Sequence, residues 1–235
     1  MAIIIGAVVL VIGAKCIGQS IWVVLTAMGT IGVVLWAIFR DSILEFWRRP
    51  ILQILPSEWE PPYFRPAPLV DSDNKRVGTS YAITIELENR GETLAKNCQP
   101  LLTGAGSKDK GKWQKEDNWL PLSLLWALDE ASMQASGKPT EERDLVPHRP
   151  YSFNLGAVRT TDPDNLSISV IIYPTGQRTA FPPGEYCFEI KVFAATVKPI
   201  CKYFYVQWDG KCSENHEEVK KKLRVFAKDV PPWRA

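Results

Sequence analysis

Residues 81–87 read Tyr-Ala-Ile-Thr-Ile-Glu-Leu, and this stretch decides the fold class of the chain. Its large apolar side chains stand at every second position, with alanine, threonine and glutamate between them. A period of two is typical of a β-strand that buries one face against a core and turns the other to solvent. The sequence Asn89-Arg90-Gly91-Glu92 follows and is typical of a turn. The stretch therefore predicts a strand, a chain reversal and a second strand.

The same period recurs across residues 69–210, between turn signals. We expect further strands at roughly 94–102, 122–128, 151–155, 166–173, 186–193 and 203–208. In the strand that follows the Pro-Pro-Gly turn at 182–184, Tyr186, Phe188, Ile190 and Val192 share one face. Many short strands without a long helix between them predict an all-β sandwich over residues 69–210.

Two runs resemble a known family. The run YAITIELENRGETLAKNC (81–98) resembles the start of the immunoglobulin-like modules of prokaryotic membrane and surface proteins, including the bacterial cell-adhesion modules. Asn89, Gly91, Ala95 and Asn97 match the Asn-x-Gly turn and the Ala-x-Asn strand of those modules. The run FPPGEYCFEIKV (181–192) resembles their late Pro-Gly-x-Tyr strand. The resemblance covers roughly residues 75–208 and implies an immunoglobulin-like sandwich that serves as a binding or spacer module.

Residues 1–39 are almost free of charge. Lys15 is the only charged residue between positions 2 and 39, and residues 21–39 give 19 uncharged positions, enough for a helix across a bilayer core of about 30 Å. Two arrangements are open: a hairpin of two spans at 2–17 and 21–39, joined by Gly-Gln-Ser at 18–20, or a single span at 21–39. A cleaved signal peptide fits poorly, because no lysine or arginine precedes the apolar run.

Basic residues set the predicted orientation of this segment. Arg40, Arg48 and Arg49 follow the second apolar stretch, whereas Lys15 alone precedes it. An excess of basic residues belongs on the cytoplasmic side, so we expect an integral protein of the plasma membrane with residues 40–235 in the cytoplasm. Trp47 with Arg48 and Arg49 suits the lipid headgroup region and predicts contact with the membrane surface.

The segments that flank the sandwich are predicted to differ from it. Over 40–68 we expect a juxtamembrane helix that ends at Pro50, followed by a stiff linker, because residues 56–68 contain five prolines. Over 211–235 we expect a short helix at 214–228, with Val219, Leu223 and Phe226 on one face, and then a loose tail.

Cysteine and histidine content argues against catalytic and metal sites. Cys16, Cys98, Cys187, Cys201 and Cys212 form no Cys-x-x-Cys pair, which favours free thiols in a reducing compartment; a Cys187–Cys201 disulfide is the alternative if the domain lies outside the cell. The two histidines, His148 and His216, are isolated, and the Cys-x3-His spacing of Cys212 and His216 lacks a second pair of ligands. We therefore predict no metal, no cofactor and no enzymatic activity.

Binding is the remaining function. The net charge is only +2, so we expect no nucleic-acid partner, and no motif for a small-molecule substrate is present. Two long connections, 103–121 and 129–147, are predicted loops, and loops on a rigid scaffold commonly bind. Trp113 and Trp119 lie in the first of them and could anchor a protein partner or cap the sandwich instead.

We therefore expect a membrane-anchored interaction or scaffold module that recruits a protein partner. The first alternative is an accessory subunit of a larger membrane complex, for which Gly6, Gly13, Gly29 and Gly32 offer small-residue faces. The second alternative is an extracytoplasmic adhesion or envelope-binding domain, which would require the opposite topology.

Overall fold

The computed structural model describes residues 21–55, 64–127, 141–172 and 175–234, without the side chains of 21–24, 42–47 and 64–65. The chain divides into two compact units, Met1–Arg49 and Pro50–Ala235. The predicted first span at 2–17 and the turn at 18–20 lie outside the described residues.

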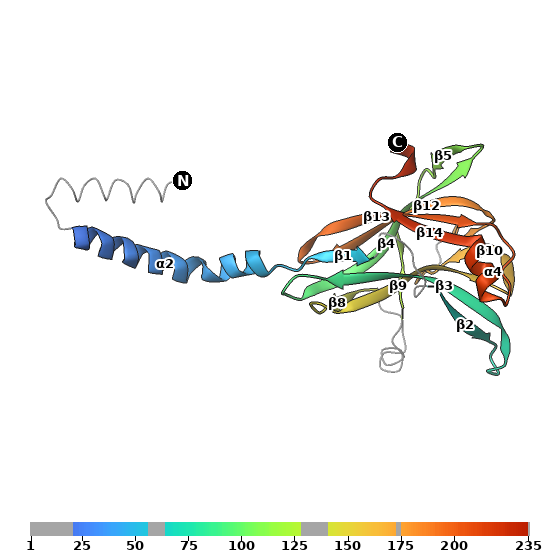
Figure 1. Ribbon diagram of the computed structural model, residues 1–235, viewed down its shortest axis with the longest axis horizontal. Coiled ribbons are helices and arrows are strands. Elements are labelled where there is room, and N and C mark those ends of the chain that lie inside the picture. The colour runs from blue at the N-terminus through green and yellow to red at the C-terminus, as the bar shows by residue number, and fades with distance from the viewer. Residues whose placement is uncertain (1–20, 56–63, 128–140, 173–174, 235) are drawn as a thin grey trace. The chain divides into compact units, whose positions relative to one another are not determined.

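The first unit contains the helix α2 (Ile21–Arg48), drawn in blue in Figure 1. It joins the predicted span and the predicted juxtamembrane helix into one element and ends before Pro50, which cannot continue a helix. Among residues whose side chains are described, no helix is both long and apolar enough to cross a membrane. The predicted transmembrane segments are therefore not confirmed and stay a prediction.

The second unit is a sandwich of two antiparallel sheets (Figure 1). The first sheet has the order β1 (Leu52–Leu55), β3 (Arg76–Asn89), β9 (Pro150–Arg159), β10 (Asp162–Ile168) and β11 (Ala180–Phe181), with β2 (Phe64–Val70) on β3 and β7 (Leu125–Trp126) on β9. The second sheet has the order β14 (Leu223–Lys228), β13 (Val197–Trp208), β12 (Gly184–Ala194), β4 (Ala95–Asp109) and β5 (Lys112–Lys115), with β6 (Leu122–Ser123) and β8 (Arg143–Leu145) on β4. The predicted all-β sandwich is confirmed.

Side chains from alternate positions fill the space between the sheets. The predicted inward face of β12 is confirmed, because Tyr186, Phe188, Ile190 and Val192 are all buried. The largest fully buried side chains come from both sheets and include Tyr81, Phe153, Phe181, Phe188, Phe204 and Trp208. Each large apolar side chain buried in this way contributes roughly 1.5–3 kcal/mol, so this shared core determines the stability of the sandwich.

The predicted strand at 122–128 is instead two short strands that serve different sheets. β6 pairs with β4 in the second sheet, and β7 pairs with β9 in the first. The chain crosses between the sheets at Leu124, which is fully buried and bridges to Val170. The alternation of apolar residues over 122–128 indicates a strand but does not show that the chain passes from one sheet to the other there.

After the helix, which ends before Pro50 as predicted, the structure differs from the linker predicted over residues 56–68. Leu52 and Ile54 of β1 are buried, and β1 pairs with the last residues of β3, whereas β2 pairs with its earlier part. Because β9 takes the other edge of β3, β1 and β2 lie one after the other along the same edge. The predicted linker is therefore wrong at residues 64–68, which belong to β2. Residues 56–63 of the linker lie outside the described residues.

The predicted short C-terminal helix is present, but it is shorter than residues 214–228 and a strand follows it. The helix α4 covers only His216–Lys222, with the Asn215 side chain accepting a hydrogen bond from the Glu217 N–H at its start. The chain then leaves the helix and forms β14, which pairs with β13. The alternation of Leu223 and Val225, both buried against the core, explains why a strand replaces the expected helix. Phe226, predicted to share a face with Leu223, points to the opposite side of β14.

Residues 103–121 do not form one long loop. β4 continues to Asp109, and a two-residue turn leads into β5. Lys110 and Gly111 have φ angles of 47° and 81°, as a type I′ turn requires. Of the second predicted loop, residues 128–140 lie outside the described residues and Arg143–Leu145 form β8.

Asn89, one of the residues that carry the family resemblance, is a fully buried polar junction. Its side-chain oxygen accepts hydrogen bonds from the N–H groups of Ile51 and Gly91, both at 3.1 Å. Its amide nitrogen donates to the carbonyl oxygens of Thr93 at 2.7 Å and Leu145 at 3.0 Å. One side chain thus joins the start of β1, the turn after β3 and the end of β8.

Candidate functional site

The structure separates the two tryptophans that the sequence singled out. The indole N–H of Trp119 donates to the carbonyl oxygen of Leu102 at 3.2 Å, and its ring packs near Phe181 with the ring centroids 6.4 Å apart. Trp119 therefore caps the sandwich core, as its alternative interpretation predicted. Trp113 lies on β5 and instead packs on the outward face of the second sheet.

Five aromatic side chains gather on that outward face, and we call this set the outer aromatic face. Its members are Trp113, Tyr203, Tyr205, Phe226 and Trp233. They come from β5, β13, β14 and the C-terminal turn η1 (Pro232–Arg234). β13 supplies two of them because its residues alternate between the inner core and this outer face. The sequence run Lys-Tyr-Phe-Tyr-Val-Gln-Trp (202–208) carries the signal, since both of its faces are apolar.

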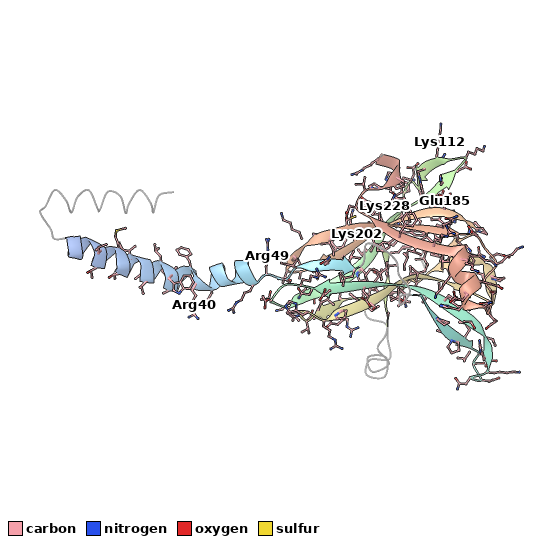
Figure 2. The ribbon with its side chains drawn as sticks, in the orientation of Figure 1. Arg40, Arg49, Lys112, Glu185, Lys202 and Lys228 are labelled. Carbon is pink, nitrogen blue, oxygen red and sulfur yellow. The ribbon has the colours of Figure 1, made fainter. Side chains whose placement is uncertain are left out.

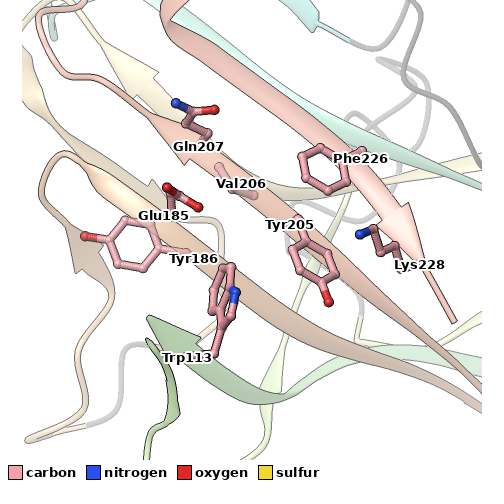
Figure 3. Close-up of a pocket in the computed structure, with 8 residues that line it drawn as sticks. All are labelled: Trp113, Glu185, Tyr186, Tyr205, Val206, Gln207, Phe226 and Lys228. Carbon is pink, nitrogen blue, oxygen red and sulfur yellow. The ribbon is translucent and has the colours of Figure 1, made fainter. Parts of the chain in front are cut away.

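The rings at one end of the outer aromatic face form a small platform. Tyr205 and Phe226 are stacked, with centroids 5.2 Å apart and an interplanar angle of 12°. Trp113 meets Tyr205 edge-on at 5.5 Å and 80°. Beside them lies an open pocket of about 210 Å³, shown in Figure 3. Sites for drug-sized ligands usually measure about 300–1,000 Å³, so this pocket suits one or two side chains better than a whole small molecule.

Charged groups flank the platform on both sides (Figures 2 and 3). The Lys228 ammonium lies 4.9 Å from the centroid of the Tyr205 ring and 5.5 Å from that of Phe226, which is a cation–π geometry. Glu185 lines the same pocket, and its carboxylate is paired with the Lys108 ammonium at 2.9 Å. Lys228 thus places a positive charge over two of these rings and forms no ion pair with another described residue.

The C-terminal tail covers the other end of the outer aromatic face. The Tyr205 hydroxyl donates to the carbonyl oxygen of Val230 at 3.2 Å. The Trp233 ring meets Tyr203 edge-on at 6.2 Å and 86°. Gly106 allows this approach, because a Cβ at that position would lie 2.6 Å from Trp233 Cζ3. The tail, predicted to be loose, is therefore packed on the sheet.

Two titratable groups of this face, the Cys187 thiol and the Tyr205 hydroxyl, are neutral at pH 7 because burial raises their pKa values. Burial, with a smaller effect from Glu189, raises the pKa of the Cys187 thiol to about 12. Burial also raises the pKa of the Tyr205 hydroxyl to about 12. At neutral pH the thiol is a poor nucleophile and the hydroxyl a hydrogen-bond donor, so these groups suit recognition of a ligand.

The prediction of free thiols is confirmed for the four described cysteines. Cys187 lies opposite Tyr205 in the β12–β13 ladder, whereas Cys201 lies opposite Lys191. The two are thus not cross-strand partners, and the alternative Cys187–Cys201 disulfide is wrong. Cys16 lies outside the described residues.

Cys212 and His216, the pair with Cys-x3-His spacing, do not form a metal site in the described structure. The His216 ring stacks on Tyr81 with centroids 5.8 Å apart, and burial raises the pKa of the Cys212 thiol to about 11. In the part of the chain that is described, no three histidine, cysteine or acidic side chains gather as metal ligands would. His148 lies at the sandwich surface, with its Nε2 atom 3.6 Å from the Glu92 carboxylate.

The residues predicted to touch the membrane surface lie at the end of α2. Arg48 is the last residue of the helix and Arg49 follows it, and both are exposed. The backbone of Trp47 belongs to α2, but its side chain lies outside the described set. Their contact with lipid stays a prediction.

Comparison with known proteins adds no family assignment, because neither a family model nor a curated protein sequence matches the chain. The immunoglobulin-like resemblance therefore rests on the matching residues alone.

Proposed function

We propose that this protein is a membrane-anchored, non-enzymatic interaction module whose immunoglobulin-like sandwich holds a protein partner through the outer aromatic face. The observation that carries the proposal is a cluster of aromatic side chains on the solvent side of a rigid sheet, beside an open pocket. Tyrosine and tryptophan dominate the residues on which protein interfaces depend, because they bury large areas with few rotatable bonds.

Other ligand classes fit this face less well. The pocket of about 210 Å³ is small for a free metabolite. One acidic and one basic side chain, Glu185 and Lys228, line it, Glu185 is paired to Lys108, and the whole chain carries a net charge of only +2. Nucleic-acid sites are usually lined by an excess of positive charge, so a protein surface is the best match.

Membrane anchoring rests on the N-terminal segment. Residues 21–39 contain no charged side chain. Within α2, large apolar side chains are exposed around the helix, namely Leu25, Met28, Ile31, Val33, Val34, Trp36, Ile38 and Phe39. A helix that is apolar on all sides needs apolar surroundings, which a bilayer supplies. We propose that this segment holds the sandwich at the cytoplasmic face of the membrane, with Trp47, Arg48 and Arg49 at the headgroups.

The test compares two exposed phenylalanines of the same sheet. Phe226 belongs to the outer aromatic face and is 39% exposed, whereas Phe193 lies on β12 outside that set and is 37% exposed. The full-length chain and its Phe226→Ser and Phe193→Ser variants would be solubilised in mild detergent from their own membranes and separated by native electrophoresis. We expect a discrete heteromeric complex that Phe226→Ser abolishes and Phe193→Ser leaves intact. A complex that survives both substitutions would refute the role of this face.

Topology is tested separately with reporters fused to the C-terminus. A reporter active only in the cytoplasm should work, and one active only outside should not. The opposite result would favour the extracytoplasmic adhesion alternative.

The accessory-subunit alternative is favoured by one observation on α2. Among the described residues, a Cβ added at Gly29 or Gly32 would meet no atom within 4 Å, so this part of the helix is small enough for a close helical neighbour. If the protein is a subunit bound through its helix, Gly29→Leu with Gly32→Leu should dissociate the complex while Phe226→Ser does not.

A further inference from the structure

We propose that the outer aromatic face recognises a turn-forming, proline-containing segment of the partner, with an acidic residue beside the prolines. This inference rests on the proposed function and names the class of partner. The chain's own residues 230–233, Val-Pro-Pro-Trp, already lie on the adjoining part of the same face and indicate the chemistry that it holds.

The contact between Tyr205 and the tail is the first step of the argument. Proline has no N–H group, so a segment with two prolines presents mainly carbonyl oxygens to a hydrogen-bond donor. Aromatic side chains also provide surfaces on which proline rings pack. Here the Tyr205 hydroxyl donates to the carbonyl oxygen of Val230, the residue directly before the two prolines, at 3.2 Å.

The aromatic residue after the prolines provides the second step. Trp233 packs edge-on against Tyr203, and Gly106 leaves the space that its ring occupies. Pro231 is buried and Pro232 is half-buried. The tail bends at residues 229–230 and turns at Pro232–Arg234, where the Arg234 N–H donates to the Pro231 carbonyl oxygen at 3.2 Å. It is thus held at a carbonyl, at its prolines and at an aromatic ring, which together define a binding mode for a proline-containing turn.

The pocket next to the tail extends the same chemistry. The Tyr205 ring lines the pocket, while its hydroxyl holds the tail, so the two regions are continuous. Trp113 and Phe226 supply further ring surface on which a proline can pack. Lys228 lies over the Tyr205 and Phe226 rings and forms no ion pair with a described residue. Its charge complements an acidic residue next to the prolines of the partner.

The test uses the full-length chain in detergent with residues 230–235 removed, which uncovers the face. The probe is a fluorescein-labelled peptide with the sequence of residues 229–234, Asp-Val-Pro-Pro-Trp-Arg, and its binding is followed by fluorescence anisotropy. A matched peptide has alanine in place of both prolines. We expect the matched peptide to bind about tenfold more weakly, and the intact chain to bind the probe about tenfold more weakly than the shortened one, because its own tail competes.

Two further variants make the result decisive. Trp233→Ala loosens the tail without shortening the chain and replaces the truncation if the shortened chain does not fold. Adding two glutamates to the N-terminus of the probe should strengthen binding, adding two lysines should weaken it, and Lys228→Glu should reverse this order. Equal binding of the proline and alanine peptides, or no binding of either, would refute the proposal.

The outcome is separable from that of the proposed function. If Phe226→Ser dissociates the membrane complex while both peptides bind equally well, the face binds a partner of different chemistry, and only proline recognition is refuted. If the complex survives Phe226→Ser while the proline peptide binds selectively, the proposed route to the partner in that complex is refuted and the recognition chemistry stands.

Discussion

The two faces of the second sheet use the same kinds of side chain for different purposes. On β13, Phe204 and Val206 point inward and are covered by the other sheet, whereas Tyr203 and Tyr205 point outward. The outward pair is also buried, but its cover consists of single side chains from β5 and the tail. One strand thus buries both faces, and only the inner cover is a complete layer of structure.

This difference separates stability from recognition. The inner face of β13 is exposed only if the two sheets separate. The outer face is exposed in part when the C-terminal turn η1 moves away. Aromatic residues on the inner face should therefore be needed for folding, and those on the outer face for binding.

The largest effect is expected on the inner face. Phe204→Ala leaves a cavity between the sheets and should lower the free energy of unfolding by about 3–5 kcal/mol. Phe226→Ala, at 39% exposure, should lower it by less than about 1 kcal/mol. Chemical denaturation of both variants measures the two losses, and similar losses would contradict the distinction between the faces.

Removing the buried polar side chain of Asn89 tests whether the fold depends on apolar packing alone. Asn89→Ala would leave the buried N–H of Gly91 and the carbonyl oxygen of Leu145 without their hydrogen bonds to Asn89. At about 1–2 kcal/mol for each of these two unsatisfied buried groups, the free energy of unfolding should fall by about 2–4 kcal/mol. Asn89→Asp keeps the acceptor but loses the donor, so its loss should be intermediate; a larger loss for aspartate would mean that the buried charge dominates.

Thiol labelling probes the outer cover directly. Cys201 is half-buried beside Tyr203, whereas Cys98, Cys187 and Cys212 are buried and burial raises their pKa values to about 11–12. Iodoacetamide at pH 7.5, with mass-spectrometric mapping, should modify Cys201 first among these four. Trp233→Ala should speed the modification of Cys201 and leave that of Cys98 unchanged. Equal acceleration at both cysteines would indicate general unfolding.

The smallest effect concerns an exposed link between the loop before α4 and β3. The Thr79 hydroxyl donates to the Glu214 carboxylate at 2.6 Å, and the Arg76 guanidinium donates at 2.7 Å. These contacts hold the pKa of Glu214 below its ordinary value of 4.5, so they stabilise the fold above that pH, and the gain is lost as pH falls through the lowered pKa. Glu214→Gln should melt at a slightly lower temperature than the wild type at pH 7. The difference should shrink in acid, and a constant difference would contradict the assignment.

Alternation of side chains was sufficient to predict the long strands. Ile83 and Ile85 on β3, and Phe188 and Ile190 on β12, face one well-defined core, and a one-residue slip would expose all of them. The short strands could not be predicted in this way. β14 contains only six residues and follows a lysine-rich helix, so its pairing with β13 is decided by tertiary contact.

The candidate site could be predicted only in part. Trp113 was recognised because a tryptophan among lysines is unusual, but the same reasoning selected Trp119, which belongs to the core. Phe226 was assigned to a helix face, and Trp233 to a loose tail. These residues come together only because β5, β14 and the tail all pack beside β13. Such contacts between distant segments cannot be predicted from the local sequence pattern.

The sheet edge formed by β1 and β2 affects the tendency of the protein to aggregate at high concentration. An open sheet edge presents free N–H and C=O groups to which another chain can add, and this is a common route to aggregation. Pro66 and Pro68 of β2 have no N–H to offer, and β1 has only four residues. At the far edge of the other sheet, β5 has only four residues and carries a lysine at each end. Both borders thus discourage polymerisation, which would matter most for a protein that is crowded with its own copies.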